Sequence, residues 1–261
     1  MTLHLIQLRP DMPRLMRWAA SNGVLPRDDD DLGYALHAVL NACFQGLSPA
    51  PFALLRDSGA AAPMAICARD TEDWRTQGML LAYSAHDAAA LAAQAAAFAL
   101  PDATVALGLD RLAGKAMPER FAGGRRLGFR VRVRPIVRAD RDGDRTRTRE
   151  VDSFLAAVAG TAPGEGPARA DVYRDWLVRH LAEGGAGVEA LTLQAFRLSQ
   201  VHRRTQPDAG QARHLRRQLG PDATFSGTLT VRDPECFSAL LARGVGRHRA
   251  FGFGMLLLRP A

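Results

Sequence analysis

The end of this chain constrains its fold more than any other feature, because four glycines stand there in two pairs between a helix pattern and an apolar run. The helix pattern begins at Asp233, which is an N-cap candidate followed directly by proline. The apolar run, 253–258, is typical of a buried strand. Glycine tolerates positive φ and close approach of other backbone, so we expect a sharply turned, glycine-rich loop from helix to strand. The four glycines are Gly244, Gly246, Gly252 and Gly254.

The nucleotide-binding motifs that use glycine do not fit this ending. A dinucleotide fingerprint needs a strand before the glycines and a helix after them, and here the order is reversed. A P-loop needs Gly-Lys-Ser/Thr, which is missing from this stretch. Between the two glycine pairs lie Arg247, His248 and Arg249. Two interpretations stay open: a backbone cradle that presents basic side chains to a polyanion, or a tight helix-to-strand connection with solvated basic residues.

The first half of the chain reads as alternating strands and helices. The expected strands are 3–8, 52–56, 64–68 and 79–83, and the expected helices are 31–44 and 85–100. A loop rich in proline and aspartate is expected between the first strand and the first helix. Strand, helix, strand, strand is the first half of a ferredoxin-like fold.

The second half opens with a basic strand. In 127–138, Phe129, Val131 and Val133 alternate with arginines, so one face is core and the other is a row of guanidinium groups. A polar hairpin or mobile loop is expected at 138–149 and a linker at 161–167. A helix is expected at 171–181, and strands at 191–201 and 225–231. The prediction is an α+β chain of two tandem ferredoxin-like (RRM-like) domains, 1–124 and 125–261, with a C-terminal glycine-rich loop.

Charge and cysteine usage indicate the kind of partner and compartment. The formal net charge is +7 and the pI is near 10.3, as for proteins that bind polyanions. Lys115 is the only lysine, although a GC-rich genome would also favour arginine. The three cysteines lack metal-ligand or disulfide spacing, and no set of carboxylates is arranged for a metal, so we expect no metal or cofactor. The sequence shows no signal peptide and no membrane span. We therefore expect a cytoplasmic protein without a membrane partner.

The glycine-rich ending resembles a known family. Gly244-Val-Gly246, five further residues, Gly252-Phe-Gly254 and a final apolar strand resemble the C-terminal signature of the repeat-associated RNA-binding proteins, and specifically the CasE family of CRISPR repeat endoribonucleases. The resemblance recurs at 127–137 and at 34–37, and departs from the family at 11–28 and 138–221. It implies two tandem ferredoxin-like domains and metal-independent cleavage of precursor crRNA 3′ of the CRISPR repeat hairpin. The implied products carry a 5′-hydroxyl and a cyclic phosphate, and the implied partners are the crRNA and other subunits of a Cascade-type complex.

Tyr34 and His37 are the candidate catalytic residues. Three residues apart on a helix, they share one face. Cleavage of RNA without a metal needs a group that takes the 2′-hydroxyl proton, a group that protonates the leaving 5′-oxygen, and positive charge for the phosphorane. The resemblance assigns catalysis to this pair, with His37 as general acid or base and Tyr34 orienting the hydroxyl or stabilising charge. The alternative is that both rings pack in the core.

The candidate RNA contacts lie on the basic strand and in the glycine loop. Duplex RNA exposes phosphates more readily than bases, so rows of arginine suit it. Arg141 and Arg145 are expected instead to form salt bridges with nearby aspartates. The alternative function is a noncatalytic CRISPR RNA-binding subunit; a membrane-binding protein would need a basic amphipathic helix. The expected RNA-binding set is Arg125, Arg126, Arg130, Arg132, Arg134, Gly244, Gly246, Arg247, His248, Arg249, Gly252 and Gly254.

Overall fold

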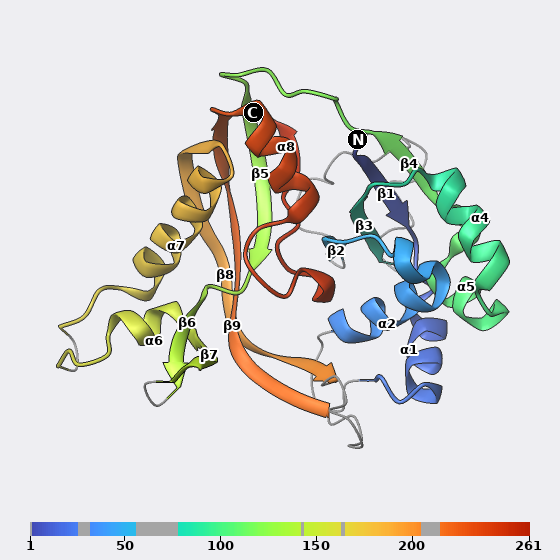
Figure 1. The fold of residues 1–261 in the computed structure, drawn as a ribbon, viewed down its shortest axis with the longest axis horizontal. Helices are drawn as coiled ribbons and strands as arrows, with labels where there is room; N and C mark the ends of the chain where they lie inside the picture. Colours follow the sequence, from blue (N-terminus) through green and yellow to red (C-terminus); the bar gives the residue numbers. More distant parts are fainter. Residues whose placement is uncertain (1, 26–31, 56–77, 142–143, 163–164, 205–214) are drawn as a thin grey trace.

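The chain forms an α+β structure with two four-stranded antiparallel sheets, which confirms the α+β part of the prediction (Figure 1). The computed structural model describes residues 2–25, 32–55, 78–141, 144–162, 165–204 and 215–261. The expected strand at 64–68 and the acidic stretch 28–31 lie outside these residues. Among the described helices, none is long and apolar enough to cross a membrane.

The first sheet has the order β2-β3-β1-β4, with antiparallel pairing throughout. This is the order of a β-α-β-β-α-β unit, in which the first strand lies inside the sheet. Helices α1, α2, α4 and α5 accompany it. The bounds are β1 His4–Leu8, α1 Met12–Ser21, α2 Gly33–Phe44, η1 Gln45–Leu47, β2 Phe52–Leu55, β3 Met79–Ser84, α4 Ala88–Phe98, α5 Pro101–Leu107, η3 Leu109–Arg111 and β4 Ala113–Ala116.

Both faces of this first sheet are buried. Ile6 and Leu80 belong to a core cluster with residues of the helices, whereas Leu5 and Tyr83 belong to a cluster with residues of the second sheet. All six residues of β3 are buried for this reason. A strand buried on two faces reads as a continuous apolar run, which is why 79–83 shows no alternation of polar and apolar residues.

The second sheet has the order β10-β5-β9-β8 and repeats the strand arrangement of the first. The two-stranded ribbon β6–β7 and helices α6 and α7 are inserted between β5 and β8. The bounds are β5 Arg126–Val133, β6 Ile136–Arg141, β7 Asp144–Asp152, α6 Ser153–Ala157, α7 Arg169–Glu183, β8 Ala186–Arg204, β9 Leu215–Val231, α8 Pro234–Arg243, η4 Arg249–Phe251 and β10 Leu257–Pro260.

The predicted alternation along β5 is present, but its polar face is not uniformly exposed. Phe129, Val131 and Val133 are fully buried, and Arg130 is exposed. Arg134 is only 1% exposed, so the prediction of a continuous surface row is wrong at this residue. Its guanidinium donates to the backbone oxygens of Ser199 and Gln218, because the long strands β8 and β9 extend over the end of β5.

Several elements differ from the sequence-based expectation. The residues expected to form a loop after β1 include helix α1, which begins after the N-cap Asp11 and has proline in its first turn. Helix α5 and strand β4 were not predicted. The final strand begins at Leu257 rather than Phe253, because the preceding residues belong to the turn of the glycine segment.

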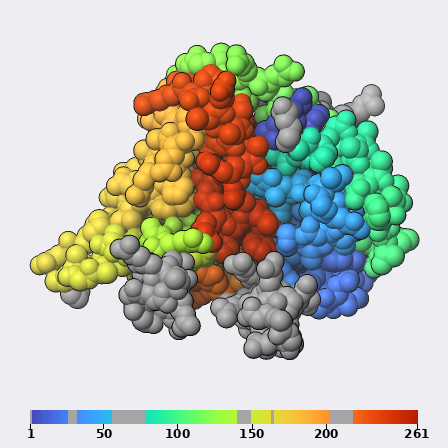
Figure 2. All heavy atoms as spheres, in the orientation of Figure 1, coloured from blue at the N-terminus to red at the C-terminus, as the bar shows by residue number. Residues whose placement is uncertain are grey.

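The two halves of the chain share a core and touch at the segment 244–254. The Tyr83 hydroxyl on β3 donates to the backbone oxygen of Leu256, 3.0 Å away and fully buried. Figure 2 shows the C-terminal residues, in red, between the residues of α7 on one side and those of the first half on the other. The C-terminal segment is therefore in contact with the first half of the chain.

Candidate active site

Helix α2 carries Tyr34 and His37 on the flank that faces the second half. The opposite side of α2 is fully buried in the helical core through residues such as Leu36 and Val39. Tyr34 and His37 are only partly buried. The expectation that both rings share a helix face is confirmed by their contacts with η4. Figure 1 shows this short helix, in red, beside α2.

Phe251, in η4, is the residue that both rings contact. Its ring meets His37 edge to face with centroids 5.2 Å apart, and it lies 6.2 Å from the Tyr34 ring. The His248 ring lies tilted beside the same phenyl ring, and their centroids are also 6.2 Å apart. Aromatic pairs at these distances attract beyond simple burial. The phenyl ring therefore joins the candidate catalytic helix to the basic part of the glycine segment.

Asn41 is the second close neighbour of His37. One helical turn further along α2, its amide nitrogen lies 3.1 Å from Nε2 and 3.2 Å from Nδ1 of the imidazole. Burial lowers the pKa of His37 below its usual 6.5. The imidazole is therefore mostly neutral at neutral pH and has a nitrogen able to accept a proton.

The glycine segment is shaped by close approaches within the protein. Gly246 has φ +72°, and a Cβ there would lie 2.7 Å from the Trp176 ring. Gly254 has φ +77°, and a Cβ there would lie 2.3 Å from the backbone oxygen of Val245. Gly244 and Gly252 also have positive φ. Three of the four glycines are buried, so they determine the path of this segment from inside the protein.

Glu150, near the end of β7, holds the basic residues of that segment. Its carboxylate accepts from Arg247 Nε at 2.6 Å and from His248 Nε2 at 2.7 Å, and the amide of Gln218 donates to it at 2.8 Å. Burial alone would raise the pKa of Glu150, but the hydrogen bonds and charges of His248 and Arg247 outweigh burial and lower it to about 2. Glu150 is therefore a carboxylate at every physiological pH.

A pocket of about 670 Å³ opens beside these residues. Arginine side chains and the partly buried His248 line it, with Glu150 as its carboxylate. Arg249 donates to the backbone oxygen of Arg243 at 2.7 Å, and burial followed by the charges of two neighbouring arginines lowers its pKa. The pocket lining is Ala50, Pro51, Glu150, Ala242, Arg243, Arg247, His248, Arg249, Ala250 and Phe251.

The arginines at the two ends of β5 have different surroundings. Arg125 and Arg126 are exposed at the start of the strand, and Arg126 pairs with Glu189 at 2.6 Å. Arg132, near the end, lies over the Phe253 ring at 4.3 Å and binds Asp222 through two hydrogen bonds of 2.8 and 2.6 Å.

Asp222 is only 4% exposed and also accepts from Arg197 at 2.9 Å. Burial would raise the pKa of Asp222, but Arg132 and Arg197 lower it overall. The structure therefore brings Arg132 to the glycine segment and engages it in a buried ion pair, while Arg125 and Arg126 lie at the other end of the strand.

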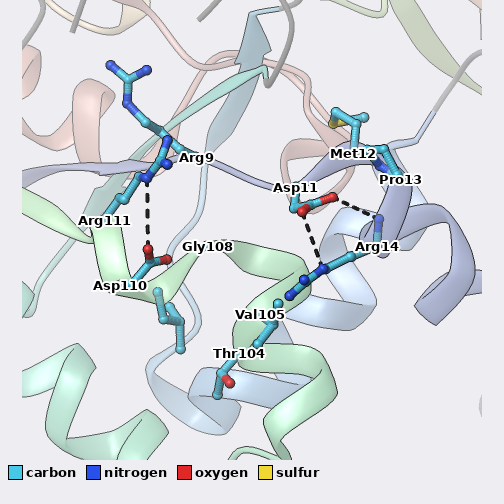
Figure 3. A pocket seen from close by; sticks show the side chains of 11 residues that line it. Arg9, Asp11, Met12, Pro13, Arg14, Thr104, Val105, Gly108, Asp110 and Arg111 are labelled. Carbon is cyan, nitrogen blue, oxygen red and sulfur yellow. Dashed lines mark hydrogen bonds and ion pairs between the residues drawn. The ribbon is translucent and has the colours of Figure 1, made fainter. Parts of the chain in front are cut away.

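A second pocket, of about 700 Å³, lies between α1 and α5 (Figure 3). Arg14 pairs there with Asp11 at 3.5 Å, and Arg111 with Asp110 at 3.8 Å. None of the predicted site residues lines it. Within the part of the chain that the structure describes, no group of three or more His, Cys, Asp or Glu side chains is placed to hold a metal ion.

Sequence reasoning missed three residues of this site. Asn41 follows His37 by four residues, so helical spacing alone would have indicated the contact. Phe251 lay within the glycine motif, but only the packing of the two halves shows that it contacts α2. Glu150 directly follows the predicted polar hairpin, 138–149, and gave no signal of its own, because its partners come from β9 and from the segment 244–254.

Comparison with known proteins shows that nearly the whole chain matches one protein family. The model of a family described as "CRISPR associated protein" matches residues 3–260. The CRISPR-associated endoribonuclease Cse3 of Thermus thermophilus is 33% identical over 144 residues, which are 52% of this chain and 57% of that protein. The aligned region thus spans little more than half the length of this curated relative.

Solved structures agree over the full length. A structure of the CRISPR endoribonuclease Cse3 bound to a 19-nucleotide RNA has a TM-score of 0.60 at 20% identity, with 100% of both chains covered. A chain of a CRISPR RNA-guided surveillance complex has a TM-score of 0.53 at 15% identity, with 99% of this chain and 100% of that one covered. At these identities the likeness shows a common fold.

Proposed function

Because the chain belongs to the Cse3/Cas6e family of CRISPR-associated proteins, we propose that it is an endoribonuclease that binds the CRISPR repeat hairpin and cleaves precursor crRNA. The single observation that carries the proposal is the contact of Phe251 with both Tyr34 and His37. It brings a proton-transfer group and a phenol to the edge of a pocket lined by arginine. That combination suits attack on a phosphodiester.

The proposed reaction is transfer of the phosphoryl group to the neighbouring 2′-oxygen. The partly buried, mostly neutral imidazole of His37 takes the 2′-hydroxyl proton, the 2′-oxygen bonds to phosphorus, and the bond from phosphorus to the 5′-oxygen breaks. The leaving 5′-oxygen takes a proton from water, which yields the 5′-hydroxyl. Tyr34 orients the hydroxyl. Arginines of the segment 244–254 stabilise the charge on the phosphorane. The products are a 5′-hydroxyl end and a cyclic phosphate, and neither step needs a metal.

The proposed RNA surface combines the pocket with the exposed part of β5. Arg247 and Arg249 supply positive charge in the pocket that Phe251 and His248 also line, and Phe251 contacts Tyr34 and His37. The exposed Arg130 extends this charge along the second sheet. Arg125 and Arg126 would contact RNA that reaches the far end of the strand. We assign the buried glycines and the buried Arg134 to shaping this surface.

We also propose that residues 1–124 and 125–261 are the two ferredoxin-like domains of the family. The support is that each sheet has the strand order of a β-α-β-β-α-β unit. Since relatives occur in solved CRISPR RNA-guided surveillance complexes, the proposal includes retention of the cut RNA and assembly with other subunits in the cytoplasm.

A noncatalytic RNA-binding subunit is the alternative function. Incubation of the purified protein with the transcript of its own CRISPR locus, with and without EDTA, followed by mapping of the RNA ends, distinguishes the two. We expect one cut per repeat, 5′-hydroxyl ends and no effect of EDTA. Binding without cutting would favour the noncatalytic subunit, and a cut abolished by EDTA would exclude the proposed chemistry.

A further inference from the structure

We infer that Glu150 is a positioning residue for the proposed cleavage site, acting on His37 through His248 and Phe251. The inference rests on the proposed ribonuclease function and extends it to the β6–β7 ribbon, which the sequence indicated only as a polar hairpin. The inference rests on three contacts. The Glu150 carboxylate contacts the His248 imidazole, His248 contacts Phe251, and Phe251 contacts His37.

The first contact explains an unfavourable backbone conformation. His248 has φ +60°, a left-handed value that costs free energy for a residue with a Cβ. Its side chain is only 7% exposed and its Nε2 lies 2.7 Å from Glu150. A buried hydrogen bond to a carboxylate is among the stronger ones in proteins, so Glu150 can hold His248 in this conformation.

The second contact places Phe251. His248 is the N-cap of η4, and its backbone oxygen accepts from the Phe251 amide at 2.8 Å. With the backbone of residue 248 held, the short turn places the phenyl ring against α2. The 5.2 Å contact with Phe251 then restrains the His37 imidazole, which also lies within hydrogen-bond distance of the Asn41 amide.

The geometry also argues against Glu150 being a simple counter-charge. A residue that only reduced positive charge could do so from an exposed position, whereas Glu150 is 13% exposed and accepts three hydrogen bonds. Three converging donors fix the carboxylate in direction as well as in charge. The two roles predict different cleavage rates. Loss of a simple counter-charge would tighten RNA binding and leave the rate unchanged, whereas loss of a positioning residue would lower the rate.

The test replaces Glu150 with glutamine, which keeps the shape and removes the charge. Under single-turnover conditions with saturating repeat RNA, we expect Glu150→Gln to lower the cleavage rate by about tenfold to a hundredfold, as misplaced groups do. RNA affinity should be unchanged or higher. Glu235→Gln is the matched control, because Glu235 also pairs with an arginine, Arg120 at 3.3 Å, but on the exposed surface of α8.

A second readout does not depend on cleavage. In the free protein, NMR titration of the His37 ring should show its pKa raised toward the usual value in Glu150→Gln, because a displaced Phe251 no longer buries the imidazole. An unchanged His37 titration would overturn the inference even if the rate fell. If the wild-type protein cuts no repeat RNA, the proposed function fails, and this titration still decides whether Glu150 positions His37.

Phe251→Leu provides a variant that leaves the Glu150 contacts in place. We expect it to reproduce the rate loss and the shifted His37 titration with unchanged RNA affinity, and it serves if Glu150→Gln does not fold. Normal cleavage by a folded Phe251→Leu protein would show that the path through the phenyl ring is wrong.

Discussion

Phe251 lies edge to face against His37, with 5.2 Å between the ring centroids, although the two residues are near opposite ends of the chain. One ring belongs to a helix of the first half and the other to the turn before the last strand. The candidate site therefore exists only when both halves are folded and in contact.

Replacing His37 with alanine should abolish cleavage with little effect on binding. Removal of a proton-transfer group typically costs about 10²- to 10⁴-fold in rate, and His37 is only partly buried. The measurement is single-turnover cleavage beside an RNA-binding titration. A His37→Ala protein that cuts as fast as wild type shows that another residue carries the reaction.

The pH dependence of cleavage should report the lowered pKa of His37. Burial shifts this pKa below 6.5, and a general base must be neutral. The rate should therefore stay level as pH falls to 6.5 and decline only at lower pH, where the imidazole becomes protonated. If the single-turnover cleavage rate already begins to decline above pH 6.5, the assignment of His37 as the base is contradicted.

Glu150 should contribute to stability in a defined acidic window. Its pKa is about 2 in the folded protein against a reference value of 4.5. A lowered folded-state pKa gives stability that is fully present above about pH 4.5 and is lost as pH falls toward 2. Wild type and Glu150→Gln should therefore differ in free energy of unfolding at pH 6, and the difference should shrink progressively below pH 4.5.

Gly246→Ala should destabilise the protein even though the change adds one methyl group. The positive φ is strained for alanine, and the new Cβ would lie 2.7 Å from Trp176. The expected loss is about 1–3 kcal/mol, measured by denaturant unfolding. Gly123→Ala is the control, because a Cβ there meets nothing within 4 Å; equal stability of the two variants would contradict the packing argument.

Two neighbouring arginines of β5 should behave differently when changed to alanine. Arg130 is exposed, so its loss should weaken RNA binding and reduce the slope of log affinity against log salt by about one. Arg132 supports the buried Asp222, so its loss should cost about 1–3 kcal/mol of unfolding free energy. Salt titrations of RNA affinity and unfolding curves separate the two effects.

Local sequence patterns predicted the helices and strands that depend on residues close in sequence. The alternation in β5, the capped helix α8 and the helical spacing of Tyr34 and His37 all follow from short-range rules. Helix α1 was missed although Asp11 and the following proline form a helix start, because proline and aspartate also suit a loop.

Long-range packing decided what the patterns could not. Arg134 continues a polar face, but strands β8 and β9 extend over it and their backbone oxygens bind its guanidinium. In the same way, Phe251 and Glu150 gain their roles from partners far away in sequence. The spacing of residues within one element contains no information about such contacts.

The first sheet, buried on both faces, has a consequence for any attempt to divide the protein. Leu5 and Tyr83 face the second sheet, so a fragment ending at residue 124 would expose their apolar side to water. Such a fragment would be prone to aggregate, and the complementary fragment would lose the surface that supports its glycine turn. Heat should accordingly melt the intact chain in a single cooperative transition, with no separately folded half surviving.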